Sequence, residues 1–386
     1  MSVEFYIPGN GRLIRSRDRL VNLAPLAQAG RLAARIAFGR SFVGRAARIA
    51  AVCLALGGFA FSAGQASVTA SATPRGLMYD VGGGRRMRLV CEGAADASKP
   101  TVIFESGAFG FSGDWANVQH HLTTAGVHSC AYDRAGMGLS DPSPEQRDGV
   151  HVARDLEKLL AAAKVQGPLV LVGHSMAGAR LHLFANRNPS RIAGLVFVDT
   201  TPSEAMDDPM VRQYVAGFTE GAHAAARTAP FGILKLLSLT ALGDKVGLPP
   251  EEDLEKRWQF GSASYERTAY LETRDWPLVA VQALRTGPIN PKWPVAVVSA
   301  GVTEGVEGPR MKSVQPAPAL ASDHGYISVV DGATHNGLLT AQYSPAIVQG
   351  IDFVLNAASE GPAARRETVM RTETLASLNS QPSVSR

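Results

Sequence analysis

The chain has 386 residues, of which 45% are hydrophobic and 19% are charged, enough for one large domain with an insertion or for two ordinary domains. This composition excludes a wholly disordered protein and a collagen. The three cysteines, Cys53, Cys91 and Cys130, are too few for a disulfide scaffold and lack the CxxC spacing of a zinc ribbon, so we expect no metal site.

The formal net charge of +4 is unevenly distributed along the chain. Residues 1–48 contain nine arginines, no lysine and the two acids Glu4 and Asp18, so they carry +7 and leave −3 for the remaining 338 residues. A protein that reads nucleic acid concentrates positive charge on its folded domain. We therefore expect no nucleic-acid partner.

The pattern of residues 1–72 predicts a basic leader with a signal peptide or a membrane anchor. The 26 residues between Arg48 and Arg75 carry no charge; they begin with an apolar run over 49–61 and include the small-residue triplet Ala70-Ser71-Ala72. These are the parts of a secretory signal, with cleavage expected near Ala72. We expect a periplasmic or secreted protein. Since the basic stretch is unusually long, an inner-membrane anchor, with membrane association through the leader, is the alternative.

From residue 76 onward, short β-branched runs alternate with stretches of helical period, which predicts a mostly parallel sheet covered by helices. Eight strands are expected, at residues 77–82, 86–91, 101–106, 128–133, 169–173, 194–199, 295–300 and 326–331. Helices are expected at 115–124, 152–164, 176–186 and 345–356.

One connection is much longer than the usual 2–6 residues of this architecture. Residues 201–292, after the sixth strand, are therefore interpreted as a helical cap over the strand ends, where ligands bind in open α/β sheets. The core is then formed by residues 76–200 and 293–358. Residues 359–386 are rich in Ser, Thr, Arg and Glu without sustained apolar periodicity, and are interpreted as a disordered tail.

The strongest motif is Gly173-His174-Ser175-Met176-Ala177-Gly178, between a predicted strand and a predicted helix. A serine in such a tight turn projects its hydroxyl above the sheet at a helix N-terminus. With the opening GGGRRMRLVCEG, the turn YDRAGMGLSD (132–141) and the late GATH (332–335), the chain resembles the α/β-hydrolase superfamily over residues 77–357. Ser175 disfavours the related haloalkane dehalogenases and epoxide hydrolases, which carry Asp at this position.

A serine nucleophile needs a histidine base and an acid that orients it. His335 follows the last predicted strand, where this family places its base. Two acids remain open: Asp199, which ends the sixth strand, and Glu304, which follows the seventh strand at the family's usual acid position. Asp323 is a third option.

The resemblance also implies an oxyanion hole, made by the backbone N–H groups of Met176 and Ala108 with Gly107 beside them. The cap contributes apolar side chains, a few of which are expected to form a pocket over Ser175: Phe218, Phe231, Leu234, Leu236, Leu237, Trp258, Phe260, Tyr265, Tyr270 and Trp276. Such a pocket favours an uncharged substrate.

If the strand order of the family holds, the second and fourth strands are neighbours, and they carry Cys91 and Cys130. A disulfide between them is then reasonable in an exported protein. Two buried free thiols are the alternative.

Together these features predict a serine hydrolase that cleaves a carboxylic ester of a small, largely apolar molecule through an acyl-enzyme, with no cofactor. An amidase, a lactonase or a carbon–carbon hydrolase could use the same triad, because the fold does not fix the substrate. A non-catalytic ligand receptor that retains the pocket is the rival outside the enzymes.

Overall fold

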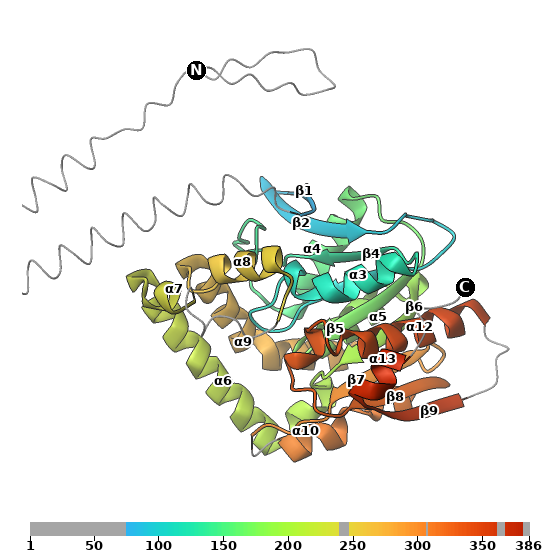
Figure 1. The fold of residues 1–386 in the computed structure, drawn as a ribbon. Coiled ribbons are helices and arrows are strands. Elements are labelled where there is room, and N and C mark those ends of the chain that lie inside the picture. Colours follow the sequence, from blue (N-terminus) through green and yellow to red (C-terminus); the bar gives the residue numbers. More distant parts are fainter. Residues whose placement is uncertain (1–74, 239–246, 306–307, 361–366, 381–386) are drawn as a thin grey trace, which may run out of the picture. The chain divides into compact units, whose positions relative to one another are not determined.

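A computed structural model of the protein describes residues 75–386 apart from 239–246, 306–307, 361–366 and 381–386 (Figure 1). The export signal or anchor predicted within residues 1–72 lies outside this described part of the chain, as does Cys53. Among the helices that are described, none combines the length and the apolar character that a membrane span requires.

One sheet runs through the described residues, in the order β1-β2-β4-β3-β5-β6-β7-β8-β9. Strands β1 and β2, and β2 and β4, pair antiparallel, and all other neighbours pair parallel. The strands are β1 (Leu77–Gly82), β2 (Arg85–Glu92), β3 (Thr101–Glu105), β4 (Ser129–Tyr132), β5 (Leu169–His174), β6 (Ile192–Val198), β7 (Val295–Ala300), β8 (His324–Val330) and β9 (Glu367–Glu373). The predicted α/β class with a mostly parallel sheet is confirmed.

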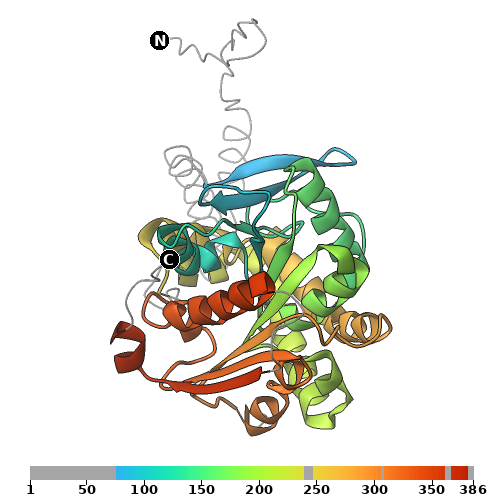
Figure 2. The same ribbon diagram turned by 90° about the vertical axis from the view of Figure 1, so that its right-hand side faces the viewer.

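The strands are buried on both faces because their side chains alternate between two hydrophobic cores. In β5, Leu171 faces the core that contains α4 (Gly149–Ala162) and α5 (Ala177–Arg187), while Val170 and Val172 face the core that contains α3 (Ala116–Thr124) and α12 (Ser344–Glu360). Figure 2 shows α12 running across one face of the sheet. Because the strands from β3 to β9 pair parallel with one another, their carboxyl ends lie at one edge of the sheet.

The segment between β6 and β7 is helical, as the long connection predicts (Figure 1). It contains α6 (Pro209–Thr228), α7 (Ile233–Ser238), α8 (Pro250–Gln259) and α9 (Ala263–Leu284). Helix α9 packs against α6 on one side and against α4 and α5 of the core on the other. Two short helices, α10 (Gly308–Val314) and α11 (Ala317–Leu320), follow β7.

The prediction of a disordered tail over 359–386, and with it the count of eight strands, is wrong for part of that segment. Residues 367–373 form β9, which pairs parallel with β8, and α13 (Leu375–Ser380) follows. Val369 packs against the core and Leu378 is buried within it, whereas Met370 points to solvent and is 69% exposed. An edge strand with so few buried apolar positions lacks a strong periodic signal in the sequence.

Candidate active site

Ser175 lies in the turn between β5 and α5 with φ of 61°, a left-handed conformation that side chains other than glycine rarely adopt. The turn is held against β6, because the Ser175 N–H donates to the Val198 carbonyl at 3.1 Å and the Thr201 N–H donates to the Ser175 carbonyl at 3.2 Å. A Cβ atom at Gly173 would lie 3.0 Å from the Cβ of Ala177. The missing side chain at Gly173 therefore makes room for alanine at 177.

His335 and Asp199 are in direct contact, with Nδ1 of the imidazole 2.7 Å from Oδ2 of the carboxylate. An ionised carboxylate only accepts hydrogen bonds, so Nδ1 carries the proton and Nε2 of the neutral ring is left to accept one. Asp199 is 6% exposed, and its φ of 45° is a second left-handed conformation at the site. Such strain is typical of residues whose position serves a function.

The other oxygen of Asp199 is held as well. Oδ1 accepts the Ala300 N–H at 3.1 Å and lies 2.6 Å from Nζ of Lys312 on α10. Burial by itself raises the pKa of this carboxyl, but the hydrogen bond and charge of His335 and the charge of Lys312 outweigh burial and hold the pKa of Asp199 well below its ordinary value. Asp199 is therefore ionised at neutral pH.

The two other candidate acids lie elsewhere. Glu304 is exposed on the wall of the pocket that contains Ser175, and Asp199 rather than Glu304 contacts the imidazole. Asp323 precedes β8, whereas His335 follows the far end of the same strand. The geometry thus joins His335 to Asp199.

The ring of His174 packs against the imidazole of His335. Its ring centroid lies 4.4 Å from that of His335, and its Nε2 lies 3.1 Å from the His335 carbonyl. Because that carbonyl only accepts, Nε2 of His174 donates. Burial and the nearby His335 lower the pKa of His174 to about 3, so the ring is neutral at physiological pH. The histidine that precedes Ser175 therefore fixes the backbone of the loop that carries His335.

Two of the predicted oxyanion residues, Met176 and Gly107, lie next to Ser175, and Ala108 follows Gly107 in the chain. Met176 is the N-cap of α5, and a Cβ atom at Gly107 would come within 2.8 Å of the Ser175 Cβ, so only glycine allows this approach. Next to Ala108, Phe109 has a φ of 54°. Among the backbone hydrogen bonds of the described loops, neither the Met176 N–H nor the Ala108 N–H is a donor.

The buried guanidinium of Arg134 holds the loop that contains Ser106, Gly107 and Ala108. Arg134 donates to the carbonyls of Ser106 at 2.7 Å and Gly107 at 2.9 Å, and it pairs with Glu105 at 2.9 Å. It also pairs with Glu272 on α9, at 2.9 Å. Arg134 thus connects the loop beside Ser175 to a helix of the segment between β6 and β7.

Glu272 lies at the centre of a cluster of buried charges. Arg147 at 3.0 Å and Arg180 at 3.3 Å also pair with it, and its side chain is fully buried. Burial raises the pKa of Glu272, but the three arginines outweigh burial and lower the pKa far below its ordinary value. The charge of Glu272 therefore depends on these partners.

A cavity of about 200 Å³ is lined by Ser175, Asp199 and His335. Tyr214 of α6, Trp276 of α9 and Met311 of α10 also line this cavity, together with Thr201, Val302, Glu304, Gly305, Gly308, Lys312 and Gln315. A few of the ten apolar cap residues were expected to line the pocket; Trp276 is among the lining residues, whereas Phe231 and Leu236 are 78% and 63% exposed.

Sequence reasoning did not find Lys312, Tyr214 or Met311. Lys312 and Met311 lie on a seven-residue helix that was not predicted, and no motif marks them. Tyr214 lies on α6. The sequence pattern predicts the apolar and polar faces of a helix, but not which face lies toward Ser175. Only the packing of α6 and α10 around the strand ends identifies these residues.

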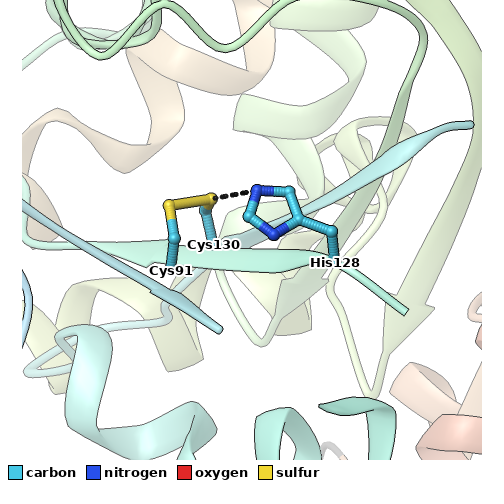
Figure 3. A group of neighbouring side chains, drawn as sticks. All are labelled: Cys91, His128 and Cys130. Carbon is cyan, nitrogen blue, oxygen red and sulfur yellow. Dashed lines mark hydrogen bonds between the residues drawn. A yellow bond between two sulfur atoms is a disulfide. The ribbon is translucent and has the colours of Figure 1, made fainter. Parts of the chain in front are cut away.

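The predicted disulfide partners are joined in the structure, with the sulfur atoms of Cys91 and Cys130 bonded across β2 and β4. His128 lies beside them, its Nε2 3.7 Å from the sulfur of Cys130 (Figure 3). These three residues are the group in the described part of the chain whose atoms are placed to hold a metal ion.

The alpha/beta hydrolase fold family matches residues 100–265 of the chain. A haloalkane dehalogenase from Mycolicibacterium smegmatis is 30% identical over 219 residues, covering 54% of this chain and 67% of that protein. The esterase PIR7B from Oryza sativa subsp. japonica is 32% identical over 156 residues, covering 40% of this chain and 55% of the esterase. The chain therefore belongs to the alpha/beta hydrolase fold family.

The structural comparison agrees on the fold. The crystal structure of the haloalkane dehalogenase DbeA from Bradyrhizobium elkani USDA94 matches with a TM-score of 0.57 and 18% identity, covering 74% of this chain and 99% of that chain. Other curated relatives match over a smaller part, since the chain spans between 17% and 31% of the length of four of them.

Proposed function

We propose that the protein is a serine hydrolase that cleaves carboxylic esters of small, largely apolar molecules through an acyl-enzyme. One observation carries the proposal: Asp199 holds His335 by its Nδ1 proton in the same cavity that contains Ser175, itself held in a left-handed turn. This is the set of parts that a serine nucleophile needs, a base and an acid that fixes its tautomer.

In the first half of the reaction, the Ser175 oxygen attacks the ester carbonyl carbon while Nε2 of His335 takes the hydroxyl proton. The negative charge that develops on the carbonyl oxygen is stabilised by the N–H groups of Met176 and Ala108. The carbon–oxygen bond to the alcohol then breaks, and the imidazolium of His335 returns its proton to the departing alkoxide.

In the second half, a water molecule attacks the acyl carbon, and His335 takes one of its protons. Collapse of this second intermediate breaks the bond to Ser175, which regains the proton from His335, and releases the carboxylic acid. The charge of Asp199 stabilises the imidazolium in both halves. No step requires a cofactor.

The walls of the cavity support the proposed substrate class. Tyr214, Trp276, Val302 and Met311 supply apolar surface, and about 200 Å³ accommodates a small acyl group. The esterase among the relatives is a precedent for this chemistry in the family. As the leader predicts, we propose that the protein acts in the periplasm, outside the cell or at the inner membrane.

The test is steady-state hydrolysis of p-nitrophenyl acetate and butyrate by the full chain. Activity should be present in the wild type, and Ser175→Ala should lose about 10³-fold or more of it. Ser359→Ala, on α12 and outside the cavity lining, should match the wild type. A fluorophosphonate probe should add one label to the wild type and none to Ser175→Ala.

Two results would contradict the proposal. Release of halide from 1-bromobutane without ester cleavage would indicate the reaction that names the haloalkane dehalogenases among the relatives. Tight binding of an ester with no turnover and no labelling would indicate a receptor.

A further inference from the structure

His128 lies beside the pair of Cys91 and Cys130, and its surroundings define which ring nitrogen carries the proton. Strand pairing places Cys91 directly opposite Cys130, and His128 precedes Cys130 by two residues, so its side chain leaves the chain on the same side. Figure 3 shows the imidazole beside the two sulfur atoms, with a dashed line from its Nε2 to Cys130. The sequence shows no such group, because the two cysteines are far apart in the chain.

The tautomer of His128 is set by two backbone carbonyls. Nδ1 lies 3.1 Å from the Glu92 oxygen and 3.0 Å from the Gly93 oxygen. Both oxygens only accept, so Nδ1 carries the proton and Nε2 presents its lone pair toward the sulfur of Cys130. A histidine that ligates a metal has this same arrangement, with its other N–H donated to a carbonyl or a carboxylate.

Nothing about the disulfide requires this histidine. A disulfide has no S–H, so it offers the lone pair of Nε2 no proton. The donor atoms of Cys91, His128 and Cys130 all lie within 4.8 Å of one another, and Cys91 is exposed while Cys130 is buried. The site is therefore reachable from solvent on one side and closed on the other.

We propose that the reduced protein binds one Zn²⁺ ion through the sulfur atoms of Cys91 and Cys130 and Nε2 of His128, and that the disulfide and the metal-bound form exclude each other. A dithiol supplies two electrons and two protons, which break the S–S bond and leave two thiols, while the dithiol becomes a cyclic disulfide. Zinc then replaces both thiol protons, which pass to solvent, and two Zn–S bonds and one Zn–N bond form.

The donor set selects the metal. Two thiolates and one imidazole match the ligands that zinc takes in tetrahedral sites, and water from the exposed side of Cys91 completes the fourth position. Magnesium and calcium prefer oxygen ligands and are not expected here. The proposed zinc site shares no residue with the cavity that contains Ser175. The test of zinc binding is therefore independent of the test of ester hydrolysis.

The experiment uses the full chain with Cys53→Ser in every variant, so that no third thiol contributes. Protein reduced with dithiothreitol and then freed of it under inert gas is titrated with Zn²⁺ against a chromophoric chelator. It should bind one equivalent, and the oxidised protein should bind none. Co²⁺ in place of Zn²⁺ should give thiolate-to-cobalt charge-transfer absorption in the reduced sample alone.

His128→Ala should weaken zinc binding by at least about 10-fold, the size of effect seen when even an outer partner of a metal ligand is lost. His151→Ala is the matched control, since His151 lies on α4 and contacts Asp148 instead. Circular dichroism of each reduced variant checks its folding. Three results would overturn the proposal: equal zinc binding by both redox states, no binding by the reduced chain, or undiminished binding by folded His128→Ala. The comparison of the two redox states does not depend on any substitution of a ligand residue.

Discussion

The ammonium group of Lys312 lies 2.6 Å from Oδ1 of Asp199, while Oδ2 of the same carboxylate holds His335. One buried acid is thus shared between a fixed cation and the proposed base. The negative charge that would stabilise the imidazolium of His335 is partly compensated by Lys312. Lys312 is a positioning residue, because it acts through Asp199.

Lys312→Met is therefore expected to move the acid limb of the kcat/KM profile for p-nitrophenyl butyrate to higher pH. Without the lysine, Asp199 stabilises protonated His335 more strongly, so the base is lost at a higher pH. His174 also faces the imidazole, but it is neutral there and does not alter this direction.

Lys312→Arg should keep the wild-type profile. Arg310→Met is a matched control on the same helix, since Arg310 pairs with Asp208 rather than with Asp199. A role limited to holding α10 in place would lower the activity of Lys312→Met at every pH without moving the limb.

Asp199→Asn should reduce kcat for ester hydrolysis by about 10⁴-fold, because an amide no longer fixes the proton on Nδ1 of His335. Glu304→Gln should stay within about twofold of the wild type, since its exposed carboxylate is not the one that contacts the imidazole. Progress curves for both variants at pH 7.5 measure the difference. The reverse order of losses would assign the acid to Glu304.

The buried ring of His174 predicts a loss of stability in acid. The folded protein keeps this ring neutral down to pH about 3, whereas in the unfolded chain it takes up a proton below pH about 6.5. Between these values the unfolded state binds more protons, so the free energy of unfolding falls as the pH falls. From pH 6.5 to pH 5 the contribution is up to about 2 kcal/mol.

His174→Gln removes this titration but keeps a donor for the His335 carbonyl. Urea unfolding at pH 7.5 and pH 5.0 should show a smaller acid-induced loss in the variant than in the wild type. An equal loss in both proteins would show that other groups govern the acid limit.

Gly107→Ala should reduce ester hydrolysis by about 10²-fold, because the added methyl group would stand 2.8 Å from the Cβ of Ser175 and displace the loop beside it. Gly217→Ala on α6 is the control, since its added Cβ meets nothing within 4 Å and alanine favours a helix. Rates on p-nitrophenyl acetate measure both, with thermal unfolding to confirm folding.

Glu272→Gln should destabilise the fold by about 3 to 5 kcal/mol, because it leaves three buried arginines with one fewer anion. Chemical denaturation measures the change. Glu251→Gln, an exposed residue at the start of α8, is the control and should change the free energy of unfolding by less than about 0.5 kcal/mol.

The sheet was predictable because its signals are local. Runs such as residues 295–300 are β-branched and buried on both faces, and the strand has the predicted bounds. The turn at Ser175 was predictable for the same reason, since small residues flank it in the sequence. Strand β9 was not, because its pairing partner β8 lies far from it in the chain and few of its side chains are buried.

The contacts of the site depend on tertiary structure. Asp199 and Glu304 follow adjacent strands, and the sequence left the choice between them open. The left-handed conformation of Asp199 and the position of Lys312 follow from packing around the strand ends, which no spacing in the chain encodes. The cluster of Arg134, Arg147, Arg180, Glu105 and Glu272 likewise draws on segments from residue 105 to residue 272.

The contacts of the Arg134 guanidinium affect where substrate enters the cavity and where product leaves it. Since this guanidinium binds both the Gly107 carbonyl and Glu272, and both charged side chains are buried, an outward movement of α9 would break a buried ion pair and is disfavoured. Substrate and product are therefore expected to pass the rim formed by Val302, Glu304 and Gly305, which line the cavity and are exposed. Bulky side chains introduced at that rim should slow product departure without disturbing the fold.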